Sequence, residues 1–221
     1  FDAVIGTPAT RSLLLRLNDR DLELWQFDDQ GGSSLEVRKQ LAGLKSIRIY
    51  GAAQDHETLT IDFSGGMFVV PGGIFFDAGN DNLNTVLFKG IGTEGFSYRP
   101  DSASTGRGTV LAYGQTITFL DCQEAGFSNL LSLSIETQRS ADILTLGSGT
   151  VFEANTFAAG VTGQSGGVAF PPASFHDVTT LTIDTGLHDA APAQSGDLVT
   201  LNALGLAADG LKNLFVRTGK G

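Results

Sequence analysis

Residues 44–61 read Leu44-Lys45-Ser46-Ile47-Arg48-Ile49, a turn, and then Glu57-Thr58-Leu59-Thr60-Ile61. In both halves apolar side chains alternate with polar ones, which is the period of a β-strand with one buried face. An acidic residue precedes the second strand, and threonine takes its outward positions, where a β-branched polar side chain suits a strand. The stretch therefore predicts two short strands joined by a turn.

The same phrase returns farther along the chain. A second copy is Leu131-Ser132-Leu133-Ser134-Ile135 with Asp142-Ile143-Leu144-Thr145-Leu146, and a third is Thr179-Thr180-Leu181-Thr182-Ile183 with Asp197-Leu198-Val199-Thr200-Leu201. Leu211-Lys212-Asn213-Leu214-Phe215-Val216 opens a fourth. A repeat of this kind cannot bury its apolar face alone, so neighbouring coils stack and their apolar side chains form ladders inside.

We therefore expect an all-β fold, a right-handed parallel β-helix or β-solenoid of irregular repeats. If one coil takes ~20–25 residues and adds ~4.8 Å in height, the chain makes roughly eight to ten coils. The turn between Ile183 and Asp197 is much longer than the turn between Ile135 and Asp142, so the repeats are uneven. A β-sandwich is the alternative.

The N-terminal segment predicts a β-hairpin. Leucines alternate over residues 13–17, Asn18-Asp19-Arg20 offers a turn, and apolar residues resume from Leu22 to Phe27. Residues 35–44 have leucines at helical spacing but read equally as a strand over 34–41 with a turn at 43. We assign residues 1–43 to an N-terminal β-hairpin or first coil, and residues 44–221 to solenoid repeats that continue it in one domain.

Composition favours short strands and excludes some partners. Glycine supplies 29 of 221 residues, about 13% and roughly twice its average usage, which indicates many tight turns. The net charge is −10 and no Lys/Arg cluster occurs, which argues against nucleic acid and against an anionic membrane surface. No stretch reaches the ~20 apolar residues of a membrane span. Acidity is compatible with a divalent cation or with sugars.

Two further features bear on the origin of the chain and its redox chemistry. The chain begins at Phe1 and not at Met, so we expect a processed product or an excised fragment. The single cysteine, Cys122, cannot form an internal disulfide. Because its neighbours Asp121 and Glu124 are acidic, we expect a small buried hydrophobe and not a reactive thiol.

Five phrases rich in Leu, Gly and Asp carry a resemblance that covers most of the chain, apart from the stretch around residues 95–107. They lie at residues 17–24, 41–51, 58–66, 71–83 and 196–201. Together they resemble the repeat regions of giant secreted or surface proteins of aquatic bacteria such as planctomycetes. The resemblance implies an exported β-solenoid array of the cell envelope or matrix, loosely akin to calcium-binding glycine/aspartate repeats.

The resemblance also suggests a metal site. Asp77-Ala78-Gly79-Asn80-Asp81 keeps the calcium-repeat phrase, so Asp77, Asn80 and Asp81 are the candidate calcium ligands. A calcium roll needs such phrases in consecutive coils to surround each ion with 6–8 oxygens, and the equivalent turns do not keep it. Arg139 even stands where a second carboxylate is wanted. The alternative is that these acids bond the backbone of turns. No organic cofactor is expected.

Catalytic patterns occur, but in unsuitable contexts. Gly163-Gln164-Ser165-Gly166-Gly167 has the spacing of a nucleophile elbow and Gly90–Gly95 that of a dinucleotide loop, yet no predicted helix follows either. His56, His176 and His188 each neighbour an aspartate. Adjacent strand residues point to opposite faces, so such a pair acts together only in a turn.

The enzyme alternative is a β-helix polysaccharide lyase or hydrolase. Hydrolysis needs two carboxylates on one outer face, ~5–5.5 Å or ~6.5–9.5 Å apart. The acids that could stack are Asp62, Asp81, Asp142, Asp184 and Asp197. Basic partners for a lyase are sparse, so we predict that the chain is not an enzyme.

We predict instead an extracellular or cell-surface module, structural or adhesive, of a larger protein. A self-assembling filament or surface-layer subunit is a further alternative. Its partners would be neighbouring repeats or copies of itself end to end, with polysaccharide as a second candidate. Trp25, Tyr98 and Tyr113 are candidate sugar contacts if they lie on turns, and packing residues otherwise.

Overall fold

The computed structural model describes residues 2–4, 11–28, 30–51, 56–80, 83–150, 158–187, 196–202 and 210–218. Within these residues the chain is all-β, as predicted, and its one helical element is a short 3-10 turn, Leu41–Gly43. A strand precedes that turn, which confirms the strand reading of residues 34–41 over the helical one.

The strands are short, apart from two that run on through a bend. In chain order they are β1 (Asp2–Val4), β2 (Arg11–Asn18), β3 (Asp21–Phe27), β4 (Ser33–Gln40), β5 (Ile47–Tyr50), β6 (Glu57–Asp62), β7 (Ile74–Asp77), β8 (Thr85–Lys89), β9 (Gly95–Pro100), β10 (Gly108–Ala112), β11 (Gln115–Leu120), β12 (Glu124–Glu136), β13 (Ile143–Ser148), β14 (Ala159–Ser165), β15 (Val168–Ala169), β16 (Ala173–Asp184), β17 (Leu198–Leu201) and β18 (Asn213–Arg217).

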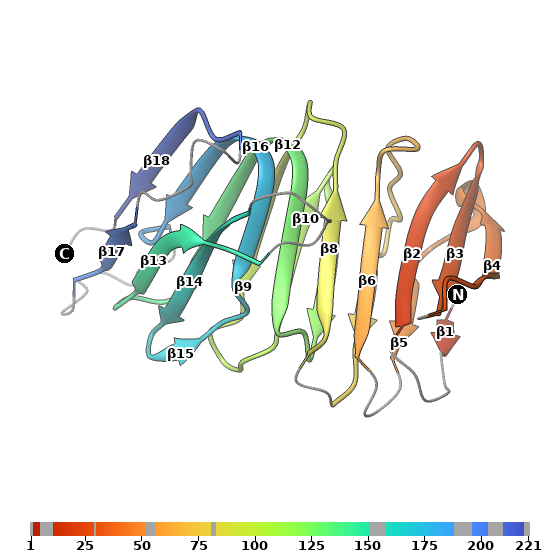
Figure 1. Cartoon of the computed structure of the whole chain (residues 1–221), viewed down its shortest axis with the longest axis horizontal. Helices are drawn as coiled ribbons and strands as arrows, with labels where there is room; N and C mark the ends of the chain where they lie inside the picture. Colours follow the sequence, from red (N-terminus) through yellow and green to blue (C-terminus); the bar gives the residue numbers. More distant parts are fainter. Residues whose placement is uncertain are drawn as a thin grey trace.

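Strands from successive passes of the chain pair in parallel. One ladder contains β2, β6, β8 and the first parts of β12 and β16, side by side in that order, and the later part of β16 pairs with β18. A second contains β1, β5, β7 and β11, and β13 pairs with β17. In Figure 1 the strands follow one another along the long axis, with β2–β4 at one end and β17–β18 at the other.

A bend in the two longest strands joins the ladders and curls the sheet. The first part of β12, Glu124 to Ser128, pairs with β8, and its later part, Ser132 to Ile135, pairs with β9. Between them Asn129 has a φ of 55°, and Asp177 of β16 has a φ of 52° in the equivalent place. Asn and Asp are the non-glycine residues that adopt this left-handed backbone most readily. The side chain of Asn129 also donates to the carbonyl of Gly90 at 2.9 Å, which ties the corner to the level below.

Inward-facing side chains form continuous apolar rows across the ladder, as the alternation predicts. One row of in-register positions is fully buried and contains Leu15, Ile61, Phe88, Phe127 and Phe175. The rings of Phe88 and Phe127 are stacked, with centroids 5.2 Å apart. Each strand therefore covers the apolar side chains of its neighbour with its own, and the burial of these side chains stabilises the sheet.

The second, third and fourth copies of the phrase pair with one another, whereas β5 and β6 of the first copy pair with β1, β7, β2 and β8. The spacing between paired strands also differs from the expectation. Leu133 of the second copy pairs with Leu181 of the third, which pairs with Leu214 of the fourth. Thr58 pairs with Thr85, 27 residues later, and Ile143 pairs with Leu198, 55 residues later. The expected coil of ~20–25 residues, and with it the estimate of eight to ten coils, is wrong. Antiparallel excursions such as β13–β15 lengthen the path between stacked strands.

The predicted N-terminal hairpin is confirmed. β2 and β3 pair antiparallel around a turn in which Asp19 has a φ of 58°, and β4 adds a third antiparallel strand. Glu23 of β3 lies fully buried here and accepts hydrogen bonds from the Asn18 amide, the Trp25 indole and the Arg38 guanidinium. These bonds satisfy a buried carboxylate that would otherwise be costly.

Candidate functional site

The turn after β7 holds the described part of the predicted calcium site. Asp77 ends β7 and its carboxylate accepts a hydrogen bond from the backbone N–H of Gly79 at 3.2 Å. Asn80 is exposed, and Asp81 lies outside the described residues. Within the described part of the chain, no three His, Cys, Asp or Glu side chains are grouped as metal ligands. Asp77 thus makes the turn bond of the alternative reading, and calcium binding stays a prediction.

A buried amide organises this turn. The side-chain nitrogen of Asn84 donates to the carbonyls of Ala78 at 3.0 Å and Asp121 at 3.2 Å, and its oxygen accepts from the N–H of Glu57 at 2.8 Å. Cys122 lies buried close by. Burial raises the pKa of its thiol, and the neighbouring acids Asp121, Asp77 and Glu57 raise that pKa further. The prediction of a small buried hydrophobe at Cys122 is confirmed.

Of the three aromatic residues singled out as candidate sugar contacts, Tyr98 and Trp25 lie on strands, and Tyr113 lies on the turn between β10 and β11. Tyr98 is fully buried and its hydroxyl donates to the carbonyl of Pro171 at 2.9 Å, so its assignment as a sugar contact is wrong. The indole N–H of Trp25 donates to Glu23 at 2.8 Å, with the Arg16 guanidinium 5.5 Å from the ring centroid. Tyr113 lies half-buried, with its ring edge-on to Phe63.

Neither letter-matched catalytic motif has the helix that its chemistry needs. Ser165 is the last residue of β14, and a turn at Gly166-Gly167 leads directly into β15. The Ser165 hydroxyl is buried and accepts the backbone N–H of Arg139 at 3.1 Å. Residues 90–95 connect β8 to β9, again without a helix. Both motifs are therefore strand connections, as expected.

Of the acids named for a hydrolase, two lie together within the described residues, and the other two described acids lie apart from them. Asp142 and Asp197 lie together, but Asp142 accepts the Thr137 hydroxyl at 2.5 Å and Asp197 accepts the Thr185 hydroxyl at 2.6 Å. The backbone N–H of Asp142 also donates to Asp197. Two other acids lie in different rows, Asp62 beside Arg16 and Lys89, and Asp184 beside Glu136 and Arg217.

The histidines are dispersed as well. His56 is exposed in the connection before β6, and His188 lies outside the described residues. His176 lies in β16, and its Nδ1 is 3.2 Å from a carboxylate oxygen of Asp177. The expectation that these neighbours point to opposite faces is wrong here, because the left-handed backbone of Asp177 interrupts the strand alternation.

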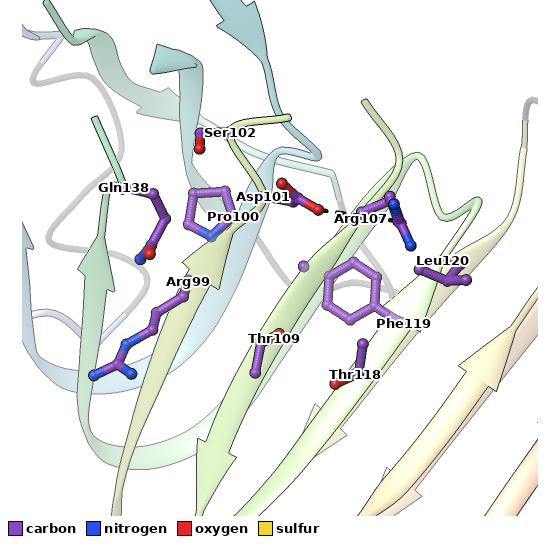
Figure 2. A pocket seen from close by; sticks show the side chains of 11 residues that line it. Arg99, Pro100, Asp101, Ser102, Arg107, Thr109, Thr118, Phe119, Leu120 and Gln138 are labelled. Atoms are coloured by element: carbon purple, nitrogen blue, oxygen red, sulfur yellow. Dashed lines mark ion pairs between the residues drawn. The ribbon is translucent and has the colours of Figure 1, made fainter. Parts of the chain in front are cut away.

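The outer face of β9, β10 and β11 is hollowed into a cleft of about 340 Å³, which we call the outer cleft. In Figure 2 the side chains of Arg99, Thr109 and Thr118 follow one another across the three strands, and the strands are paired in that register. Pro100 and Phe119 line it too, beside the turn residues Asp101, Ser102 and Arg107 and the side chain of Gln138.

The charges of the outer cleft are largely neutralised in pairs. Arg99 donates to Glu136 at 2.6 Å, and the Ser97 hydroxyl donates to the other oxygen of the same carboxylate, also at 2.6 Å. Arg107 lies 4.0 Å from Asp101. Paired charges and hydroxyls suit hydrogen bonding to a polyhydroxylated ligand better than capture of an ion. The alternation of side chains over residues 95–100 could have indicated this strand face from the sequence. The resemblance gave no information about it, because residues 95–107 lie outside the resemblance.

A comparison with protein-family models, with curated proteins and with solved structures finds no match for this chain. Among the described residues, no helix has the length and apolar character needed to cross a bilayer.

Proposed function

We propose that the chain is a segment of a parallel β-solenoid that serves as an extracellular structural or adhesive module and not as an enzyme. Support for the solenoid comes from the in-register parallel pairing of strands that are 27 to 55 residues apart. Sandwiches are built mainly from antiparallel neighbours. Within the described residues, antiparallel pairs are confined to local hairpins at β2–β4, β9–β11 and β13–β16.

The observation that carries the structural role is a difference between the two ends of the stack. At one end lies β4, which is mostly polar and exposed, with Glu36, Arg38 and Lys39 among its side chains. Charged side chains on an edge strand oppose the addition of another strand. This end resembles the polar cap that terminates a repeat array.

The opposite end is apolar. On β17 and β18 four large hydrophobic side chains are between 40% and 56% exposed, and they are Leu198, Leu201, Phe215 and Val216. Within the described residues β17 pairs with β13 and β18 with β16, each on one side. An edge strand with exposed apolar side chains is a template for a further strand.

A further coil of the same kind is the partner that fits this end. It would continue the parallel ladder and cover the exposed leucine and phenylalanine side chains, as Leu181 covers Leu133 inside the stack. A neighbouring repeat would supply it in a structural module. A second copy of the chain would supply it where the apolar ends of two copies meet, which makes a self-assembling subunit the second candidate function, supported by the same apolar end.

Adhesion is supported by the outer cleft. Its hydroxyls and paired charges lie on a regular strand face, where extended ligands such as polysaccharides can contact several strands at once. The acidic net charge keeps such a module soluble and disfavours polyanionic partners.

Sedimentation velocity tests the proposed stacking end. We expect the purified chain to associate through its apolar end into dimers as the concentration rises, and we expect the double variant Leu198→Lys, Phe215→Lys to sediment as a monomer. Met67→Lys is the matched control, because Met67 is 60% exposed and lies outside β17 and β18. A wild-type chain that stays monomeric at every concentration, or equal association of all three proteins, would reject stacking through this end.

A further inference from the structure

A second hollow lies on the outer face of β6, β8, β12 and β16, and we call it the His176 groove. Its volume is about 330 Å³, at the lower end of the range of small-molecule sites, about 300–1,000 Å³. It follows the in-register positions Thr60, Leu87 and Gly126, and Gly126 has no side chain to fill it. Ser128 and His176, paired across β12 and β16, line it as well.

His176 carries an unused hydrogen-bonding atom. The residue is only 5% exposed, and its Nε2 has no hydrogen-bond partner in the described part of the protein. The other ring nitrogen, Nδ1, lies 3.2 Å from the Asp177 carboxylate, which can only accept. In the neutral ring the proton therefore sits on Nδ1, and Nε2 is left as an acceptor. Buried polar atoms without partners are rare, and a binding role is one of the explanations for such an atom.

Apart from Lys89, the rest of the lining is neutral and rich in hydroxyls. Thr58, Thr60 and Ser128 supply hydroxyl groups, and Leu87 supplies an apolar surface. Lys89 also lines the groove, but its in-register neighbour on β6 is Asp62, so a carboxylate lies beside the cation. With a net charge of −10 on the whole chain, this face does not favour an anion.

We propose that the His176 groove binds a neutral saccharide chain. One sugar hydroxyl donates to Nε2 of His176, the apolar face of a ring lies over Leu87, and further hydroxyls exchange hydrogen bonds with Thr58, Thr60 and Ser128. The required ligand must offer a donor, an apolar face and several hydroxyls without charge, which is the chemistry of a neutral sugar. This inference rests on the proposed adhesive function, and it adds a second site to the outer cleft and names the ligand class of that site.

Isothermal titration of the whole chain with neutral hexasaccharides tests the site. The probes are cellohexaose, laminarihexaose and mannohexaose, with hexagalacturonate as the acidic counterpart. We expect at least one neutral probe to bind, and we expect His176→Phe to weaken that binding about tenfold, since the ring shape is kept and the Nε2 acceptor is lost. Thr60→Val removes one groove hydroxyl and should weaken binding by a smaller factor.

Thr85→Ala is the control variant. It removes a hydroxyl from the same face outside the groove, and it should leave binding unchanged. Absence of binding by every neutral probe, binding by hexagalacturonate alone, or unchanged binding by both His176→Phe and Thr60→Val would overturn the proposal. Sedimentation distinguishes the two proposals, because failure of the groove leaves the stacking of the apolar end intact, and a monomeric chain leaves the groove intact.

Discussion

Truncation of a single core leucine should reveal how strongly the stacked levels depend on one another. Leu133 of β12 is fully buried, with Phe96 of β9 on one side and Leu181 of β16 on the other in register. Leu→Ala changes in packed cores cost about 2–5 kcal/mol, the larger values where the surroundings cannot collapse. Because paired strands hold both neighbours in place, we expect Leu133→Ala to lower the free energy of unfolding by about 3–4 kcal/mol.

Urea denaturation measures this loss, and the chain provides its own control. Leu131 lies on the same strand but is 48% exposed, so Leu131→Ala should cost less than about 1 kcal/mol. The midpoint should fall for Leu133→Ala with little change in the slope. For a chain of this size the expected loss corresponds to a melting temperature lowered by roughly 6–16 °C. Equal losses for the two variants, or a loss below about 1 kcal/mol for Leu133→Ala, would refute the ladder as the source of stability.

Three further predictions concern buried polar groups and the calcium turn. Hydrogen bonds from Trp25, Arg38 and Asn18 lower the pKa of Glu23 from 4.5 to about 2. The contribution of Glu23 to stability is therefore complete above pH 4.5 and is lost as the pH falls toward 2. The urea midpoint should fall with pH across this range, and Glu23→Gln should remove most of that pH dependence. Asn84→Ala removes the amide that bonds buried backbone groups of Glu57 and Ala78. It should lower the free energy of unfolding by at least about 2 kcal/mol in the same assay, and a loss near zero would contradict the role of the amide. If the turn after β7 binds calcium, millimolar calcium should raise the melting temperature by several degrees relative to chelator, and an unchanged value would leave Asp77 as a turn residue alone.

The features that could be predicted from the sequence depend on local alternation. Apolar residues at every second position placed Leu59, Leu133 and Leu181 on the buried face, and the hairpin followed from a turn signal between alternating leucines. The stacking of the second, third and fourth copies followed from their similarity. The alternation and the hairpin are set by residues close together in the chain, where period and turn chemistry act directly.

The features that were missed depend on residues far apart in the chain. The number of residues between paired strands could not be predicted, because inserted hairpins lengthen the chain between them without changing the alternation of apolar and polar side chains. Tyr98 was placed on a turn, yet it lies on a strand whose inward face meets Phe119 and Phe127. The His176 groove forms only when β8, β12 and β16 lie side by side, so no local sequence pattern predicts it.

Disulfide trapping tests the parallel in-register stack most directly. In a Cys122→Ser background, Ser134→Cys and Thr182→Cys place two thiols at paired, half-exposed positions of β12 and β16. Neighbouring strands are about 4.8 Å apart, inside the Cα separation that a disulfide accepts. Ser134→Cys with Thr180→Cys, offset by two residues, lies about 8 Å apart and should not close. Rapid oxidation of the first pair and not of the second is the predicted result, and failure of the first pair or equal oxidation of both would contradict the stacked fold.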